Sequence, residues 1–250
     1  MPIISIEQLS FTYPDGTRAL DSITLHIDRN ETIGIAGPNG AGKTTLINHL
    51  CGYTLPQSGK ISLMGTSLTK ETVDIIRKKI GVVFQNTDDQ LFMPSVVDDV
   101  AFGVRSSGLS AREAHESAIK KLQELGLDHL AKKPPFHLSQ GQKRFVAFAG
   151  ILAMQPQVII MDEPTADLDP RHRRTTMELI RSLSDTTRLI VSHDLDFLWE
   201  TCGRIVLINE GAIAADGPAH DVLADESLLR ENGLELPLQL QGKNNRNPPV

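Results

Sequence analysis

Residues 37–45 read Gly37-Pro38-Asn39-Gly40-Ala41-Gly42-Lys43-Thr44-Thr45 and match the phosphate-binding pattern G-x-x-x-x-G-K-[ST] at every fixed position. The apolar run before this loop, residues 33–36, predicts a buried strand, and residues 45–50 predict the opening of a helix. Glycine lets backbone N–H groups curl around phosphate oxygens, and a helix N-terminus attracts the same negative charge. The strand, loop and helix together predict a nucleoside triphosphate site and disfavour the alternative, a glycine-rich turn that matches by chance.

Two side chains of this loop carry specific chemistry. Lys43 is expected to reach the β- and γ-phosphates, and the Thr44 hydroxyl is expected to be a ligand of Mg²⁺. The other members of the loop are expected to contact the nucleotide as well: Gly37, Pro38, Asn39, Gly40, Ala41, Gly42 and Thr45.

The composition limits the class of protein. The chain has 250 residues and is 40% hydrophobic, which suffices for one large domain or for a core with a small subdomain. Its formal net charge of -6 argues against a nucleic-acid-binding surface, because such surfaces are usually basic. Cys51 and Cys202 have no companion ligand at metal-binding spacing, and we expect two reduced, buried thiols in a cytosolic protein.

Neither the N-terminus nor any internal segment predicts membrane insertion. The N-terminus lacks the basic region and apolar stretch of a signal peptide. The longest uncharged apolar run, residues 145–154, is too short to span a bilayer. We therefore expect a chain that does not cross a membrane by itself.

The order of apolar patterns predicts an α/β fold. Strands are predicted first at 3–13, 23–27, 32–36 and 60–64, followed by helical patterns between about 95 and 135. Strands and helices then alternate, with apolar strands at 158–161, 189–191 and 205–208. We expect one domain over 1–240, with a core of 1–94 and 138–225 and a helical subdomain of 95–137, and a disordered tail of 241–250.

A second chemical element is the apolar strand that ends in Asp162 and Glu163. In phosphate-loop enzymes a carboxylate at such a strand end holds Mg²⁺, here Asp162, and Glu163 could polarise the attacking water. Alone, the pattern would fit equally well a buried strand that happens to end in charged residues. The phosphate loop favours the functional interpretation.

A third element, Leu138-Ser139-Gln140-Gly141-Gln142, lies just before a helical pattern and resembles the signature motif of ABC transporter ATPases. The resemblance extends over nearly the whole chain. Tyr13 stands where that family has its adenine-stacking aromatic residue, Gln85 where it has the glutamine of the Q-loop, and His193 where it has the switch histidine. Residues 166–169, which include Asp167 and Asp169, match the D-loop.

This resemblance implies a phosphate-loop NTPase core with an N-terminal antiparallel β subdomain, and a helical subdomain inserted between the Q-loop and the signature motif. It also implies an ATPase with ATP and Mg²⁺ as cofactors. Two subunits would face each other head to tail, so that Ser139, Gly141 and Gln142 of one close over ATP bound to the other. We favour a homodimer over pairing with a homologue.

The resemblance also implies a role for each matched residue. Glu163 would be the general base. Gln85 and His193 would sense the γ-phosphate and order water, with Gln85 also a ligand of Mg²⁺, and Asp167 and Asp169 would couple the two sites. Gln140 departs from the glycine of most relatives, but the backbone contacts of its neighbours survive this change, so we expect activity.

Residues 84–92, Phe84-Gln85-Asn86-Thr87-Asp88-Asp89-Gln90-Leu91-Phe92, are similar to a stretch typical of energy-coupling factor transporter ATPases. That group implies a peripheral subunit at the cytoplasmic face of the membrane. Its partners would be a transmembrane coupling subunit, whose arginines could meet Asp88 and Asp89, and a substrate-binding membrane subunit. The alternative for Asp88 and Asp89 is an acidic turn with no partner.

Cobalt or nickel is the expected cargo by analogy alone, since the eight histidines show no clustered ligand spacing. The alternatives are the ATPase of another transporter class, for a vitamin such as biotin or for export, and a soluble ABC-type ATPase acting on nucleic acid. The last usually has two cassettes or a long coiled-coil insert, and this sequence shows neither.

Overall fold

The computed structural model describes residues 2–106 and 108–241, and its chain divides into two compact units. The first unit comprises the chain up to residue 76 and again from residue 187, and the second comprises residues 77–186. The expected boundaries of the helical subdomain, 95 and 137, both lie inside the second unit and stay a prediction. Of the expected disordered tail, residues 242–250 lie outside the described residues.

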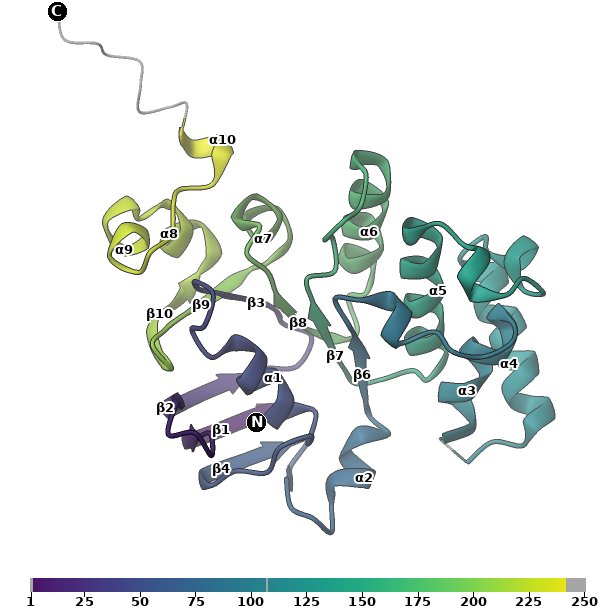
Figure 1. Ribbon diagram of the computed structural model, residues 1–250, viewed down its shortest axis with the longest axis horizontal. Coiled ribbons are helices and arrows are strands. Elements are labelled where there is room, and N and C mark those ends of the chain that lie inside the picture. Colours follow the sequence, from purple (N-terminus) through teal and green to yellow (C-terminus); the bar gives the residue numbers. More distant parts are fainter. Residues whose placement is uncertain (1, 107, 242–250) are drawn as a thin grey trace, which may run out of the picture. The chain divides into compact units, whose positions relative to one another are not determined.

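The first unit contains an antiparallel sheet with the strand order β2-β1-β4-β5 (Figure 1). In β1 the side chains of Ile4 and Ile6 are buried, and they pair in register with Ile27 and Leu25 of β2. Alternate residues of an antiparallel strand point to opposite faces, so this pattern gives the sheet one buried face. The strands are β1 (Ile4–Thr12), β2 (Arg18–Ile27), β4 (Ser58–Leu63) and β5 (Thr66–Ser67).

The first unit also contains a mostly parallel group of strands. The central strand β3 (Thr32–Ala36) pairs in parallel with β8 (Thr187–Val191) on one side and with β9 (Arg204–Asn209) on the other, and β10 (Ala212–Pro218) pairs antiparallel with β9. All five residues of β8 are buried, as expected for a parallel strand covered on both faces. The helices of this unit are α1 (Lys43–Leu50), α7 (Leu195–Thr201), α8 (Ala219–Ala224), α9 (Glu226–Glu231) and α10 (Leu238–Gln241).

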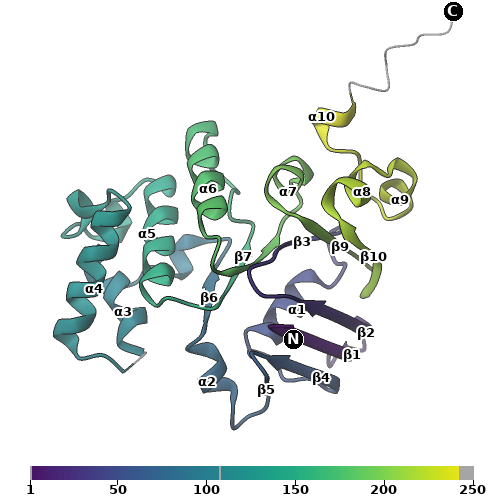
Figure 2. The same ribbon diagram turned by 180° about the vertical axis from the view of Figure 1, so that it is seen from behind.

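The second unit begins within α2 (Val73–Arg77) and combines two parallel strands, β6 (Ile80–Val83) and β7 (Val158–Asp162), with a group of helices (Figure 2). Helices α3 (Val96–Ser106), α4 (Ala111–Glu124) and α5 (Gln140–Ala153) pack on one another around a core that includes Val100, Leu122 and Val146. Helix α6 (Pro170–Ser182) follows β7, and the 3₁₀ turns are η1 (Thr87–Asp89), η2 (Asp128–Leu130) and η3 (Pro135–His137).

The predicted α/β class is confirmed, including the antiparallel sheet at the N-terminus and the helices between β6 and α5. One detail was wrong. The motif at 138–142 was expected to precede a helix, whereas residues 140–142 form the first turn of α5. Both cysteines are buried and form no disulfide, and burial raises the pKa of the Cys202 thiol to about 12. Among the described residues, no helix combines the length and apolarity that a membrane span requires.

Candidate active site

The glycine-rich loop connects the end of β3 to the start of α1 in the first unit. Gly42 precedes α1 with a left-handed backbone, at φ 103°. A Cβ atom at this position would lie 2.4 Å from the carbonyl oxygen of Ala19 in β2, so both the backbone angle and the space require glycine. Because Gly42 directly precedes α1, the N-terminal N–H groups of this helix lie at the end of the loop, where an anion can bind.

The Lys43 ammonium lies inside the curve of this loop. Its Nζ donates to the carbonyl oxygens of Gly37 at 2.7 Å and of Pro38 at 2.8 Å. These bonds hold a full positive charge beside the backbone amides of residues 37–42, and the loop therefore presents one cation and a set of N–H donors to a phosphate group.

Tyr13 lies next to the same helix. Its hydroxyl shares a 2.9 Å hydrogen bond with Oγ1 of Thr45, and its ring meets Phe11 edge to face with centroids 5.0 Å apart. The side chain is 39% exposed. An aromatic face that is fixed on one side and open on the other is suited to stacking on a base.

His193 lies at the same edge of the parallel strands as the loop. Ile35 of β3 pairs with Val191 of β8, and the backbone N–H of Ser192 donates to the Ile35 carbonyl at 3.4 Å. Both strands run in the same direction, so the residues that follow them emerge at the same edge. The first unit thus brings together Tyr13, the loop and His193.

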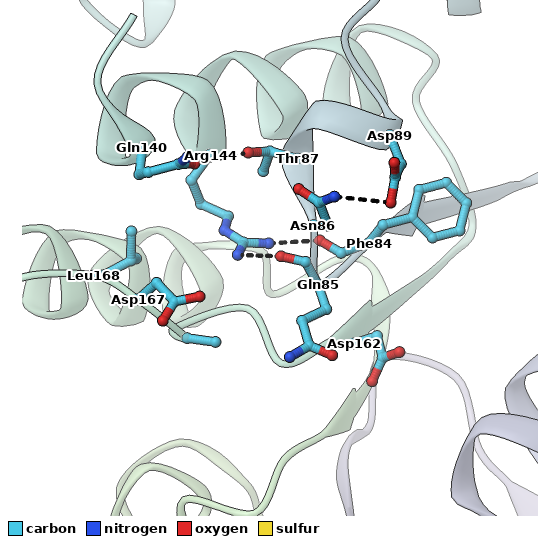
Figure 3. A pocket seen from close by; sticks show the side chains of 11 residues that line it. Phe84, Gln85, Asn86, Thr87, Asp89, Gln140, Arg144, Asp162, Asp167 and Leu168 are labelled. Atoms are coloured by element: carbon cyan, nitrogen blue, oxygen red, sulfur yellow. Dashed lines mark hydrogen bonds between the residues drawn. The ribbon is translucent and has the colours of Figure 1, made fainter.

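The second unit brings together a separate group of predicted residues at the ends of β6 and β7. Val83 pairs with Met161, so Gln85, which lies just after β6, is close to Asp162, the last residue of the neighbouring parallel strand β7. Both line a cavity of about 780 Å³, and Asp167 also lines it (Figure 3). The amide of Gln85 and the carboxylate of Asp162 point toward the same space in this view.

Glu163 and Asp167 have unusual backbones. Both adopt positive φ angles, 46° and 60°, which are costly for residues with a Cβ atom. The N–H of Ala166 donates to the Glu163 carbonyl at 3.1 Å, so a turn connects the two positions. Glu163 is only 8% exposed. Asp167 is exposed, so only Glu163 combines a strained backbone with burial, a combination that clusters at functional sites in proteins.

Ser139 is the N-cap of α5 and forms a capping box with Gln142. The N–H of Gln142 donates to Ser139 Oγ at 3.3 Å, and the N–H of Ser139 donates to Gln142 Oε1 at 3.1 Å. A serine N-cap leaves further N–H groups of the first turn directed out of the helix, together with the positive end of its dipole. The motif is thus a second potential anion-binding helix end.

Gly141 is in close contact with a residue that sequence analysis did not single out. A Cβ atom at Gly141 would lie 2.4 Å from the ring of His172 in α6. Nδ1 of His172 is 2.6 Å from Oδ2 of Asp169, the N-cap of α6. Hydrogen bonds from the His172 backbone N–H and then its ring lower the pKa of the Asp169 carboxyl group. No sequence signal marked His172, because its importance arises only from the packing of α6 on α5.

The predicted site residues thus fall into two sets, and each set lies within one unit. The first unit holds Tyr13, residues 37–45 and His193, and the second holds Gln85, Ser139, Gly141, Gln142, Asp162, Glu163, Asp167 and Asp169. Arg144, a buried residue of α5 that the sequence analysis did not select, lines the same cavity as Gln85, Asp162 and Asp167.

The possible metal ligands fit a hard cation. Thr44, Gln85 and Asp162 offer a hydroxyl, an amide carbonyl and a carboxylate, which are oxygen ligands of the kind that Mg²⁺ prefers. The described part of the chain contains no group of three or more His, Cys, Asp or Glu residues arranged to hold a metal ion. Mg²⁺ in nucleotide sites is bound by one or two carboxylates together with phosphates and water, so the single carboxylate of Asp162 fits that ion.

The loop, the acids at the strand end and the serine-capped helix define a phosphate-loop ATPase. A family model described as ABC transporter matches residues 20–166, which is more than half of the chain. The chain belongs to the ABC transporter family and is an ATP-binding subunit with the ATP-hydrolysing cassette of that family.

Relatives and solved structures of this family align with the chain over most of their length. An ABC transporter ATP-binding protein of Geobacter sulfurreducens is 45% identical over 96% of both chains. The energy-coupling factor transporter ATP-binding protein EcfA of Methanothermobacter thermautotrophicus is 40% identical over 94% of this chain and 77% of its own. The structure of cbiO1 from Clostridium perfringens, part of the ABC transporter complex cbiONQ, aligns with a TM-score of 0.83 and 36% identity over 97% of this chain and 99% of its own.

Proposed function

We propose that this ATPase drives an importer of the energy-coupling factor type from the cytoplasmic face of the membrane. The similarity to EcfA and to cbiO1 carries this proposal, because cbiO1 is part of the complex cbiONQ. The stretch 84–92, which is similar to that group of ATPases, also supports it.

The proposed docking surface for a membrane partner is formed by Asp88, Asp89, Phe92 and Phe102. Phe92 and Phe102 are 62% and 50% exposed, and their rings meet edge to face at 5.0 Å. Exposed aromatic pairs are typical of protein interfaces. Asp88 already accepts from Lys143 Nζ at 2.5 Å and Asp89 accepts from Asn86 Nδ2 at 3.0 Å, so Asp89 is the better candidate for an arginine of the partner.

In the proposed reaction each residue acts through the atoms already described. Lys43 and the loop amides bind the phosphates of ATP, while Tyr13 stacks on the base. Mg²⁺ would be held by Thr44, Gln85 and Asp162, and it would neutralise charge on the transferred phosphoryl group. Glu163 would accept a proton from the attacking water, and His193 would contact the γ-phosphate.

The proposed active form is a homodimer in which Ser139, Gly141 and Gln142 of one copy close over the nucleotide of the other. A dimeric cassette solved in a post-hydrolysis state with ADP and Pi supports this form, with a TM-score of 0.77 and 26% identity over 86% of this chain. In the dimer, Asp167 and Asp169 would couple the two sites.

For the cargo we propose cobalt or nickel ions, as in the group that the chain resembles. In this architecture a separate membrane protein binds the cargo. A vitamin such as biotin is the alternative cargo, and export or another transporter class is the alternative function.

The test is co-purification of the tagged chain from membranes of its native host in mild detergent. We expect a small polytopic coupling protein together with a substrate-binding membrane protein, which can then be tested with Co²⁺, Ni²⁺ or a vitamin. Asp89→Arg should lose these partners, while Asp185→Arg, which changes an exposed acid in the turn between α6 and β8, should retain them. Recovery of a permease pair of another class would contradict the proposal.

A further inference from the structure

One face of the signature helix α5 holds the segment 84–88 that contains Gln85. Gln140, Lys143 and Arg144 occupy positions i, i+3 and i+4 of this helix and therefore lie on one face. Oγ1 of Thr87 donates to Gln140 Oε1 at 3.4 Å, and Lys143 Nζ donates to Asp88 Oδ1 at 2.5 Å. Arg144 binds the start of the same segment.

The Arg144 contact is the strongest of the three. Its Nη1 donates to the Phe84 carbonyl at 2.6 Å and its Nη2 donates to the Gln85 carbonyl at 2.8 Å (Figure 3). The side chain is only 3% exposed. Two bonds from one planar guanidinium to consecutive carbonyls fix the orientation of that backbone, because the donors of arginine form a rigid fork whereas the ammonium of lysine rotates on a flexible stem.

The charge of Arg144 also reaches the D-loop. Burial lowers the pKa of the Arg144 guanidinium, and the negative charge of Asp167 acts in the opposite direction. Gln85, Arg144, Asp162 and Asp167 all line the same cavity. A buried cation is costly, and here the two backbone carbonyls and the charge of Asp167 compensate for that cost.

We propose that Arg144 is a positioning residue of the ATPase. It fixes the backbone of Gln85 so that the Gln85 side chain is directed toward Asp162, and it links this segment to Asp167 and to the signature helix. Gln140 and Lys143 extend the attachment to Thr87 and Asp88, so the first turns of α5 and residues 84–88 move as one piece. The inference rests on the role proposed above for Gln85.

The first experiment compares Arg144→Gln and Arg144→Lys with the parent in ATP hydrolysis by the full chain. We expect kcat to fall about tenfold or more in Arg144→Gln, because small misplacements of a catalytic group have effects of this size, while the KM for MgATP changes less. Arg144→Lys should recover part of the loss, since it retains the charge and one bond. Arg188→Gln removes another buried arginine, one that donates to Asn30 in the first unit, and should leave kcat near the parent value.

A second measurement separates positioning from general destabilisation. In Arg144→Gln, amide hydrogen exchange should accelerate in 84–91 and around Asp167, and it should remain at the parent rate in β7 and in the core of α5. Uniform acceleration over the whole second unit would overturn the proposal, because it would indicate a structural role only.

A double-mutant cycle tests whether Arg144 acts through Gln85. Arg144→Gln should lower kcat much less in the Gln85→Ala background than in the parent. Equal losses in the two backgrounds would overturn the proposal. The assay uses ATP hydrolysis alone, so its outcome is independent of whether the chain serves an importer, which the co-purification decides.

Discussion

Glu163 shows how a single residue can combine a costly conformation with a chemical role. Its backbone is left-handed and its side chain is almost fully buried at the end of β7, beside a residue suited to Mg²⁺. The left-handed backbone alone costs about 1–3 kcal/mol, burial of the carboxyl group adds a further cost, and the surrounding fold must compensate for both. The proposed role of Glu163, a base that must face a bound phosphate, explains why the fold compensates for these costs.

Glu163→Gln tests that role. The amide has nearly the same size and keeps the same backbone, but it cannot accept the proton of water. We expect the variant to bind ATP as the parent does and to hydrolyse it about 10²- to 10⁴-fold more slowly. Nucleotide binding and phosphate release measure the two effects, with Glu7→Gln on the exposed face of β1 as the control. Turnover near the parent rate would refute the role.

At the scale of elements, the contact between α5 and α6 connects the signature motif to the D-loop. Gly141 leaves no room for a methyl group, because the His172 ring occupies that space and is itself bonded to Asp169. A displacement of either helix therefore moves both motifs.

Gly141→Ala should force these helices apart. Overpacking of this kind costs about 1–3 kcal/mol of stability, and we also expect ATP hydrolysis to fall. Replacing His172 by alanine in the same chain removes the obstructing ring and should restore part of the stability, as measured by thermal unfolding. If the double variant were less stable than Gly141→Ala by the full effect of His172→Ala, the steric explanation would be wrong.

Helix α3 anchors the loop that carries Phe92 through one buried carboxylate. Oδ1 of Asp99 accepts from the N–H groups of Phe92 at 3.0 Å and of Met93 at 3.1 Å, while Oδ2 has no hydrogen-bond partner within the described residues. Burial raises the pKa of this carboxyl group. The folded chain therefore retains the Asp99 proton at pH values where the unfolded chain has lost it.

This linkage predicts a pH dependence. The contribution of Asp99 to stability falls as the pH rises from the pKa of the unfolded chain, about 3.9, through the higher pKa of the folded chain. Asn at this position can accept the same two N–H groups and does not ionise. The melting temperature of Asp99→Asn relative to the parent should therefore rise between pH 4 and pH 7, and a constant difference would contradict the raised pKa.

The elements that the sequence predicted are those with continuous apolar runs or glycine-rich motifs. The predicted strand 32–36 has the observed bounds of β3, and the helical patterns predicted between about 95 and 135 contain α3 and α4. Strand β6 escaped prediction because it is short and contains Gly81, which is required where Ile151 of α5 packs against it. Edge strand β10 escaped because Ala, Asp, Gly and Pro have low strand propensity.

Site residues could be predicted from the sequence where a motif specifies their chemistry. They could not be predicted where their role depends on tertiary packing. Lys43 and Thr44 follow from the loop pattern alone. Arg144 instead binds backbone carbonyls that are distant in sequence, and His172 packs on a glycine of another helix. No local pattern records such contacts, because they arise only when α5, α6 and the 84–88 segment pack together.

At the scale of the whole molecule, the proposed head-to-tail dimer divides each ATP site between two copies. The loop of one copy and the signature motif of the other would form a site, so each chain would contribute two different halves. This arrangement distinguishes the dimer from a self-contained subunit, since only the dimer allows two defective chains to complement each other.

Complementation between Lys43→Ala and Ser139→Arg tests the division directly. Each variant alone has a defect in both sites of its homodimer and should be inactive. In the mixed dimer, one site contains both defects and the other pairs the intact loop of the Ser139→Arg chain with the intact signature motif of the Lys43→Ala chain. With random pairing at equal amounts, half of the dimers are mixed and each has one intact site, so ATP hydrolysis should return to at most about one quarter of the parent rate.

Mixing parent chain with either variant in the same ratio calibrates how strongly the two sites depend on each other. If the mixture of the two variants hydrolyses no ATP although mixed dimers are detected, the shared site is wrong, because an intact loop and an intact signature motif would then face each other without catalysing the reaction.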